Sequence, residues 1–436
     1  MFTKVLHLSK ISGLLRNGEI DLIDFINCLC DRIDKIEPEI FSLIPEENRR
    51  ERLLNEAKQL LSVYSDKDKR PLFFGVPIGV KDIFKVDGFH TQCGSALPVE
   101  LFEGEEASCV RKLKTEGALI LGKTVTTEFA YFEPGPTKNP LNPEHTPGGS
   151  SSGSAAAVAA GFTPFAFGTQ TIGSIIRPAA FCGIYGFKSS FGRIPTDGVI
   201  PFSPSADHVG FFTQDIEGCI MAASMLCNDW NYNKICRQSK KLIIGIPDDK
   251  YLEQASDEIL TAFEKQLKVL ENNGALIKRI KLFDNIDEIN RMHRLMVAAE
   301  MAEVHKNWFA LYEPIYRTLT KQIINEGQQL GKNDPNELYN ARKGRFILRN
   351  KIESFKKNSN IDLWVSPSTL TPAPEGLEST GSPLMNLPWT YSGLPSITIP
   401  AGKNFQNLPI GLQFSGSFNE DEMMLSMIKK INDWYL

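Results

Sequence analysis

Three short segments of the chain carry residues that could perform nucleophilic chemistry. One is residues 168–174, a Gly-Thr-Gln-Thr-Ile-Gly-Ser run in which glycines precede a serine. A turn of this kind can direct successive backbone N–H groups into one cavity, where they stabilise the oxyanion that forms when a hydroxyl attacks a carbonyl. The segment therefore predicts a serine nucleophile, Ser174, beside an oxyanion hole.

A second segment, residues 146–161, is rich in glycine and serine and leads into an alanine-rich helix. The unpaired N–H groups at the start of a helix can bind anions, so the segment could be a phosphate loop, although the Lys-Ser/Thr ending of the P-loop is missing. An ordinary turn before a tightly packed helix explains the same residues equally well. The segment alone leaves both interpretations open.

The third segment, residues 75–82, places Lys81 at the end of an apolar strand and directly before Asp82. A structural lysine would reach solvent and pair with a neighbour such as Asp82. A buried lysine would lose its proton more easily, because burial disfavours the ammonium form, and a neutral lysine can act as a base. The two interpretations place the Lys81 amine in different surroundings.

Hydrophobic periodicity and turn residues predict the elements that position these segments. Residues 1–65 have helical spacing, whereas residues 72–215 alternate strand, helix and strand, which favours an α/β sheet. A last helix is expected to start near Asn419, with Glu422 completing a capping box. The other predicted strands cover 73–80, 118–122, 165–168, 241–246, 275–280, 362–365, 396–400 and 410–414, and the other predicted helices cover 106–116, 252–270, 287–312 and 335–357.

Composition argues against several classes of protein. The 436 residues are 42% hydrophobic and 23% charged, with a net charge of −4, which suits a large buried core and offers no concentrated basic face for a nucleic acid. The eight cysteines are scattered without a CxxC pair, so we expect reduced, buried thiols, no metal site and no cofactor. We recognise no signal peptide or membrane span, which makes the cytoplasm the expected location.

The three segments together resemble the amidase signature family. The family's Gly-Gly-Ser-Ser-Gly-Gly-Ser motif is matched by residues 148–154, its Gly-Thr-Asp-Thr-Gly-Gly-Ser motif by residues 168–174, and its Lys-Asp pair by Lys81 and Asp82. The resemblance is strong over a signature core, residues 72–217. Several motifs in the same order make a chance match improbable.

This resemblance implies a fold of class α/β: one large domain over residues 1–436, with a central mixed, twisted β-sheet covered by helices on both faces. The helical segment of residues 1–65 would pack on that domain. No stretch of the sequence has the composition of a linker between domains.

The resemblance also implies roles for individual residues. Ser174 would be the nucleophile, Lys81 the base, and Ser150 the serine that relays protons between them after a cis Gly149–Ser150 peptide bond. The oxyanion hole would consist of the backbone N–H groups of Thr171, Ile172, Gly173 and Ser174. Around the substrate we expect Gly149, Ser151, Tyr131, Phe132 and Trp389, although each of these aromatic residues could equally belong to the core.

Four positions depart from the family pattern. Ser152 stands where the family usually has glycine, and Gln170 stands where it frequently has aspartate. Ile172, beside the nucleophile, replaces a frequent glycine. The usual arginine comes one residue late, at Arg177. If the family's aspartate and arginine support each other, Gln170 and Arg177 could be a compensated change. We expect these departures to affect specificity more than chemistry.

The predicted function is hydrolysis of the C–N bond of a small carboxamide by a stand-alone amidase. One alternative is the glutamine-hydrolysing A subunit of a tRNA-dependent amidotransferase, which would need a partner, but residues 300–385 lack the tyrosine-rich segments of that branch. Others are an inactive binding protein with the same fold and an amidase for lipid amides. The sequence leaves open the substrate and the oligomeric state, a homodimer included.

Overall fold

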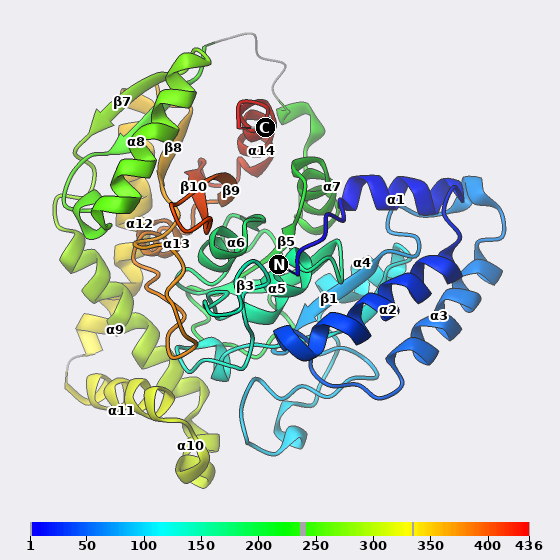
Figure 1. The fold of residues 1–436 in the computed structure, drawn as a ribbon. Coiled ribbons are helices and arrows are strands. Elements are labelled where there is room, and N and C mark those ends of the chain that lie inside the picture. Colours follow the sequence, from blue (N-terminus) through cyan, green and yellow to red (C-terminus); the bar gives the residue numbers. More distant parts are fainter. Residues whose placement is uncertain (1, 236–240, 334, 436) are drawn as a thin grey trace.

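The strands form one mixed sheet in the computed structural model, which describes residues 2–235, 241–333 and 335–435 (Figure 1). Its ten strands have the order β2-β1-β3-β5-β4-β9-β10-β8-β6-β7. Strands β2, β1 and β3 are parallel, as are β8, β6 and β7, whereas those between β3 and β8 pair antiparallel. The strands are β1 (Pro77–Lys81), β2 (Leu119–Thr124), β3 (Phe165–Gln170), β4 (Tyr185–Lys188), β5 (His208–Thr213), β6 (Ile243–Pro247), β7 (Leu276–Ile280), β8 (Leu363–Pro367), β9 (Ser396–Lys403) and β10 (Pro409–Ser415).

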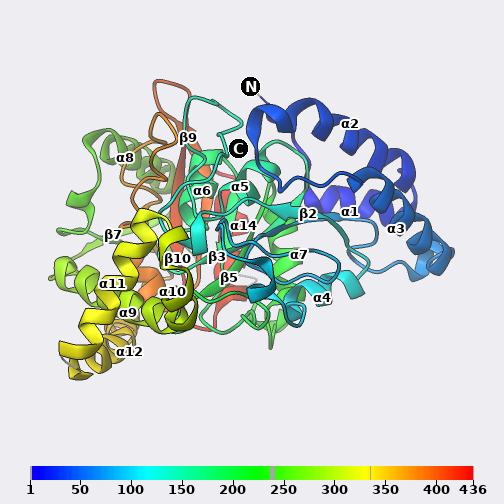
Figure 2. The ribbon, with the colours of Figure 1, turned by 90° about the horizontal axis from the view of Figure 1, so that it is seen from below.

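Helices surround this sheet (Figure 2). Helices α1–α3 lie together beside the β2 end, and α9–α12 lie at the opposite side of the molecule. The helices are α1 (Leu8–Asn17), α2 (Leu22–Ile40), α3 (Arg49–Val63), α4 (Ser108–Thr115), α5 (Ser152–Ala159), α6 (Ile176–Cys182), α7 (Ile216–Leu226), α8 (Asp257–Asn272), α9 (Ile286–Val304), α10 (Lys306–Tyr312), α11 (Thr318–Asn333), α12 (Pro335–Asn358), α13 (Leu387–Tyr391) and α14 (Asp421–Asn432).

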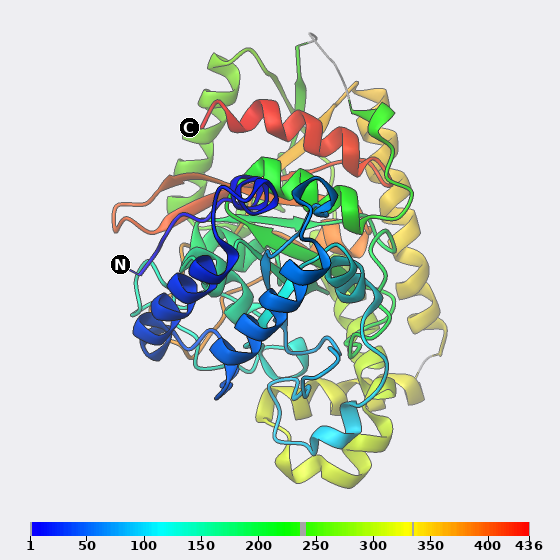
Figure 3. The ribbon, with the colours of Figure 1, turned by 90° about the vertical axis from the view of Figure 1, so that its right-hand side faces the viewer.

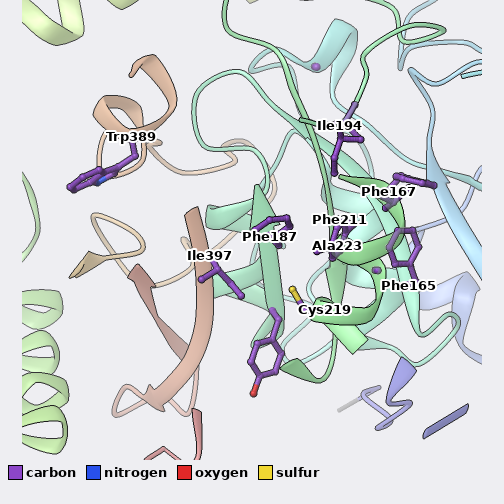
Figure 4. Packing of buried hydrophobic residues seen from close by; sticks show 14 of the residues in the cluster. Phe165, Phe167, Phe187, Ile194, Phe211, Cys219, Ala223, Trp389 and Ile397 are labelled. Carbon is purple, nitrogen blue, oxygen red and sulfur yellow. The ribbon is translucent and has the colours of Figure 1, made fainter. Parts of the chain in front are cut away.

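Both faces of the sheet are covered because successive strand residues point to opposite sides. Ala166 and Phe212 belong to an apolar cluster with residues of α5 and α6. The neighbouring Phe165 and Phe167 belong to the larger core, which also contains Ala223 of α7 (Figure 4). The two-sided cover matches the fold class that the resemblance implies.

Helices of the N-terminal segment contact the sheet and α7. Helix α3 contacts β2, and α1 contacts α7. The start of α1 is held by Asp215, whose Oδ1 accepts the backbone N–H of Leu8 at 2.7 Å. Figure 3 shows α1, α2 and α3 lying over one side of the sheet.

Several predicted elements differ from those observed. The first strand begins at Pro77 rather than residue 73, because Phe73 instead donates its N–H to the Glu116 carbonyl within a turn. The strands β4 and β5 and the helices α6, α7, α11 and α13 were not predicted. The helix expected over 287–312 is two helices, which meet at His305.

Two helix starts also require correction. Helix α8 begins at Asp257 rather than residue 252 and is capped by the Ser256 side chain. The last helix begins at Asp421 without a capping box, since Asn419 has a left-handed φ of 60°. Glu422 pairs instead with Arg193 at 2.8 Å, a contact that only the tertiary fold brings about.

The cysteines match the sequence expectation with one exception. Those of the described residues are free thiols and are buried apart from Cys28, which is exposed. Cys236 lies outside the described residues. Within the described ranges, no helix combines the length and the apolar character needed to cross a bilayer.

Candidate active site

Lys81 turns inward from the end of β1 and is fully buried. Its Nζ lies 2.7 Å from Ser150 Oγ and 2.8 Å from Thr169 Oγ1. Asp82, the alternative partner, points away and pairs with Lys123 at 2.8 Å. Of the two interpretations of this segment, the geometry supports the buried lysine.

The surroundings of Lys81 favour its neutral form. Burial lowers the pKa of this amine well below its ordinary value, because the ammonium loses its water; the negative charge of Asp207 opposes this shift. Burial also raises the pKa of the Asp207 carboxyl to about 6. A hydrogen bond from Thr171 Oγ1 to Asp207, 2.5 Å long, connects this carboxyl with the loop before Ser174.

Ser150 lies in the loop that leads into α5, two residues before the helix begins. A cis peptide bond joins it to Gly149, as the resemblance implies. Gly149 has no space for a side chain, since an added Cβ would lie 2.8 Å from Thr380 Cγ2. Ser151 is buried, and its Oγ exchanges 3.3 Å hydrogen bonds with the backbone N–H and carbonyl of Thr169. These contacts set the position of the Gly–Ser loop relative to β3.

Residues 171–174 connect β3 to α6 and have the properties of an oxyanion loop. Their four backbone N–H groups donate no hydrogen bond to any acceptor in the described ranges. Their carbonyls, by contrast, are held: His293 Nε2 lies 3.0 Å from the Thr171 oxygen, and Thr390 Oγ1 donates to the Ile172 oxygen at 2.7 Å. At Gly173 an added Cβ would overlap Asn386 Oδ1. The loop is thus fixed with its N–H groups available.

The two substituted positions, Gln170 and Arg177, make separate contacts and are not a compensating pair. The Gln170 side chain accepts the N–H groups of Ile175 and Ile176 at 2.8 and 3.0 Å, so it caps the start of α6. Arg177 donates to the carbonyl oxygen of Gly149 at 2.7 Å. Each therefore supports a different part of the site.

Ser174 lines a small pocket, which we call the inner pocket. An adjoining outer pocket has a volume of about 410 Å³ and shares four of its lining residues. A cavity of this size can hold a small organic molecule. The inner pocket is lined by Ala130, Tyr131, Phe132, Ile172, Ser174, Arg177, Phe202 and Pro383, and the shared residues are Tyr131, Phe132, Ile172 and Pro383. A larger cavity of about 630 Å³ beside α8 contains none of the predicted site residues.

The structure separates the three aromatic candidates. Tyr131 and Phe132 line both pockets beside Ser174. Trp389 does not line them; it is buried, donates from Nε1 to Tyr251 Oη at 2.9 Å and packs against Phe283. Trp389 is therefore a core residue here, and Figure 4 shows it apart from the phenylalanines of β3.

Sequence reasoning missed three residues that position the site: Thr169, His293 and Thr390. Thr169 stands inside the 168–174 motif, so its place next to the nucleophile loop was a usable signal. His293 on α9 and Thr390 on α13 are more than 100 residues from that loop, at sequence separations of 122 and 218. No local pattern marks such contacts.

The mixed sheet positions a buried lysine with a serine at its amine, and a second serine follows a loop whose N–H groups have no acceptor among the described residues. This is the architecture of a serine amidohydrolase. The comparison with family models agrees: the model described as Amidase matches residues 24–425, and the chain belongs to that family and is an amidase.

Relatives and solved structures cover almost the entire chain. The A subunit of the glutamyl-tRNA(Gln) amidotransferase from Oceanobacillus iheyensis is 29% identical over 95% of this chain and 93% of its own length. A crystal structure of an amidase superposes with a TM-score of 0.88 at 26% identity, over 99% of this chain and 100% of that one. The peptide amidase of Stenotrophomonas maltophilia has a TM-score of 0.80 at 24% identity, over 98% of this chain and 96% of its own.

Proposed function

We propose that this chain acts alone to hydrolyse the C–N bond of a small carboxamide, with Ser174 as nucleophile, Ser150 as proton relay and Lys81 as base. The observation that carries the proposal is the 2.7 Å contact between the buried Lys81 amine and Ser150 Oγ. A buried lysine with a lowered pKa is suited to accept a proton. The backbone N–H groups of residues 171–174 have no acceptor among the described residues and are available to an oxyanion.

In the first step, Ser174 Oγ attacks the amide carbon as its proton passes to Ser150 and the Ser150 proton passes to Lys81. The backbone N–H groups of residues 171–174 receive the oxyanion. The Ser174 hydroxyl has no hydrogen-bond partner within the described ranges, so its contact with Ser150 must form as the substrate binds, as is common for catalytic hydrogen bonds. Collapse of the intermediate breaks the C–N bond, and the Lys81 proton returns through Ser150 to the leaving amine.

In the second step, water attacks the ester carbon of the acyl-enzyme. Its proton passes along the same relay, the Ser174–carbon bond breaks, and Ser174 Oγ is reprotonated. The net reaction consumes one amide and one water and releases a carboxylic acid and an amine or ammonia. Neither step requires a metal or cofactor.

The test is the release of ammonia or amine by the pure chain from aliphatic amides, aryl amides and glutamine, without partner or ATP. We expect hydrolysis that disappears in Ser174→Ala. The matched control is Ser154→Ala, which removes a buried hydroxyl from the same Gly–Ser segment, bonded at 2.8 Å to the Phe167 carbonyl. Silence of the folded wild-type chain across the whole panel would refute the proposal.

A second candidate is supported by the curated relatives, which are named as amidotransferase subunits. In that function the same site would hydrolyse glutamine and would depend on partner subunits. Activity restricted to glutamine, and raised by the partner subunits of such a relative, would favour this candidate over the stand-alone enzyme.

A further inference from the structure

The two pockets beside the nucleophile differ greatly in size. The inner pocket, which Ser174 lines, has a volume of about 10 Å³. The space that a single buried water needs is about as large. The adjoining outer pocket has a volume of about 410 Å³. Because an apolar cavity of about 150 Å³ can bind benzene, the outer pocket has room for a group larger than one aromatic ring. A substrate that extends through both pockets is therefore narrow at the reacting amide and broad beyond it.

The surface of the outer pocket is mostly apolar. Ile172 contributes to it from the nucleophile loop, and Val297 and Ile323 contribute from the helices α9 and α11. Leu384 and Leu387 line it from the segment that leads into α13. Removing these side chains and an apolar ligand from water together is favourable. The lining therefore suits an apolar substituent.

Charged side chains around the outer pocket are paired within the protein or solvated. Arg291 binds Glu288 at 2.7 Å, and Arg294 binds Glu326 at 2.6 Å. Asp287, which also lines the pocket, is exposed and keeps its water. A charged substituent would lose its own water on entering this pocket and would gain little in return, which is unfavourable.

His293 also lines the outer pocket and is uncharged at neutral pH. Burial lowers the pKa of its imidazole to about 4. Its Nε2 lies 3.0 Å from the carbonyl oxygen of Thr171, the first residue of the nucleophile loop. This contact fixes the wall of the outer pocket relative to the loop that ends at Ser174. A group bound in the pocket is thereby held at a defined place relative to the nucleophile.

The position of the proton relay decides which side of the amide faces the outer pocket. In the proposed reaction the leaving amine receives its proton from Ser150, so the amine must face Ser150. The residues that line the outer pocket do not include Ser150 or Lys81, so the group in that pocket is the acyl group. Only 2% of the Ser150 surface is exposed, and so narrow a space suits ammonia better than a substituted amine.

We propose that the substrate is a primary amide with an uncharged, apolar acyl group at least the size of a phenyl ring, and that this acyl group fills the outer pocket. The inference rests on the proposed function, because it names the substrate class of the same site. Ammonia leaves when Ser174 takes the acyl group, and water then releases the carboxylic acid. Val297, Ile323 and Leu384 are residues that determine specificity without touching the reacting atoms.

The experiment compares propanamide, 3-phenylpropanamide and N-propyl-3-phenylpropanamide, with release of ammonia or propylamine as the readout. For the wild-type chain we expect kcat/KM to favour 3-phenylpropanamide over propanamide by about 10- to 100-fold, the worth of burying one large apolar group. The N-propyl amide should react about 10-fold more slowly than the primary amide, or slower still, because its amine has to fit beside Ser150.

Leu384→Asp tests the outer pocket itself. Leu384 is half-buried and lines the outer pocket but not the inner one, and aspartate has a similar size but carries a charge. This variant should bring the ratio of the two primary amides close to one. The matched control is Leu260→Asp, which changes another half-buried leucine; it packs on the core from α8 and lines neither pocket. The control should keep the wild-type ratio, since general damage to the fold lowers both rates together.

Three results would overturn the inference and leave the amidase proposal standing. One is equal or faster hydrolysis of propanamide by the wild-type chain. Another is hydrolysis of the N-propyl amide at the rate of the primary amide. The third is an unchanged ratio in Leu384→Asp.

If no amide is hydrolysed, a binding measurement still decides the inference. Titration calorimetry of Ser174→Ala should show 3-phenylpropanamide binding about 10-fold or more tightly than propanamide, and adding Leu384→Asp should remove the difference. Equal affinities, or no binding of 3-phenylpropanamide to a folded Ser174→Ala protein, would overturn the assignment of the outer pocket, whatever the outcome of the activity panel.

Discussion

Thr169 should set the orientation of the Lys81 amine, so Thr169→Val tests the proposed relay. Its Oγ1, 2.8 Å from Nζ, can accept one N–H of the neutral amine and leave the nitrogen lone pair for the Ser150 proton, at 2.7 Å. Valine has a similar shape but no acceptor. Loss of a buried hydrogen bond to a group that becomes charged costs about 1.5–3 kcal/mol. We therefore expect kcat/KM to fall by about 10- to 150-fold.

The pH dependence gives this prediction a second readout. Lys81 must be neutral to accept a proton, so activity should rise as pH increases through its folded-state pKa, which burial lowers. Thr169 also accepts a hydrogen bond from the ammonium form and stabilises it, so Thr169→Val should move the acid limb to lower pH. Initial rates of ammonia release across a pH series measure both effects.

A matched control separates this effect from general damage to the fold. Thr124→Val removes another buried threonine hydroxyl from the neighbouring strand β2, where it lies 2.6 Å from Ser154 Oγ. That variant should keep the acid limb at its wild-type pH. The reasoning is refuted if Thr169→Val retains the wild-type kcat/KM and the wild-type acid limb.

Three further substitutions have distinct expected outcomes. Lys81→Met should abolish hydrolysis without lowering the melting temperature at neutral pH. Between the lowered folded pKa and the ordinary unfolded pKa, the unfolded wild type binds more protons, so its stability rises with pH; thermal unfolding at several pH values should show this slope reduced in the variant. Gly173→Ala places a Cβ against Asn386 and 2.8 Å from a carbon of Pro383, and should lower kcat by about 100-fold or more in a protein with unchanged circular dichroism. Asp82→Asn leaves the buried Lys123 without its ion-pair partner and should lower the free energy of unfolding by about 3–5 kcal/mol in urea titrations. A shift in the acid limb of the pH–activity profile would contradict a purely structural role for Asp82.

The sequence by itself determined the chemistry-bearing segments and the class of fold. Lys81, Ser150 and Ser174 stand in short motifs whose residue types and order are visible in the sequence. The contacts that leave no room for a side chain at Gly149 and Gly173, with Thr380 and Asn386, are visible only in the fold. Strand and helix periodicity is local too, so most elements were predicted within a few residues. Strands β4 and β5 were not, because a strand depends on its pairing partners as well as on its local sequence.

Tertiary structure decided which of the open interpretations holds. The sequence places Lys81 and Asp82 side by side, but only packing shows that Lys81 meets Ser150 and that Asp82 meets Lys123. Whether an aromatic side chain such as Trp389 belongs to the core or to a pocket likewise depends on residues far away in the chain.

The surroundings of Arg177 are the plainest case, because neutral oxygens accept its hydrogen bonds. The sequence shows an arginine near the nucleophile, and acidic residues are numerous enough to pair with it. That none of the described ones does so is a property of three-dimensional distance. Charge pairing is set by which side chains the folded backbone brings within a few ångströms, and this information is not contained in any single segment.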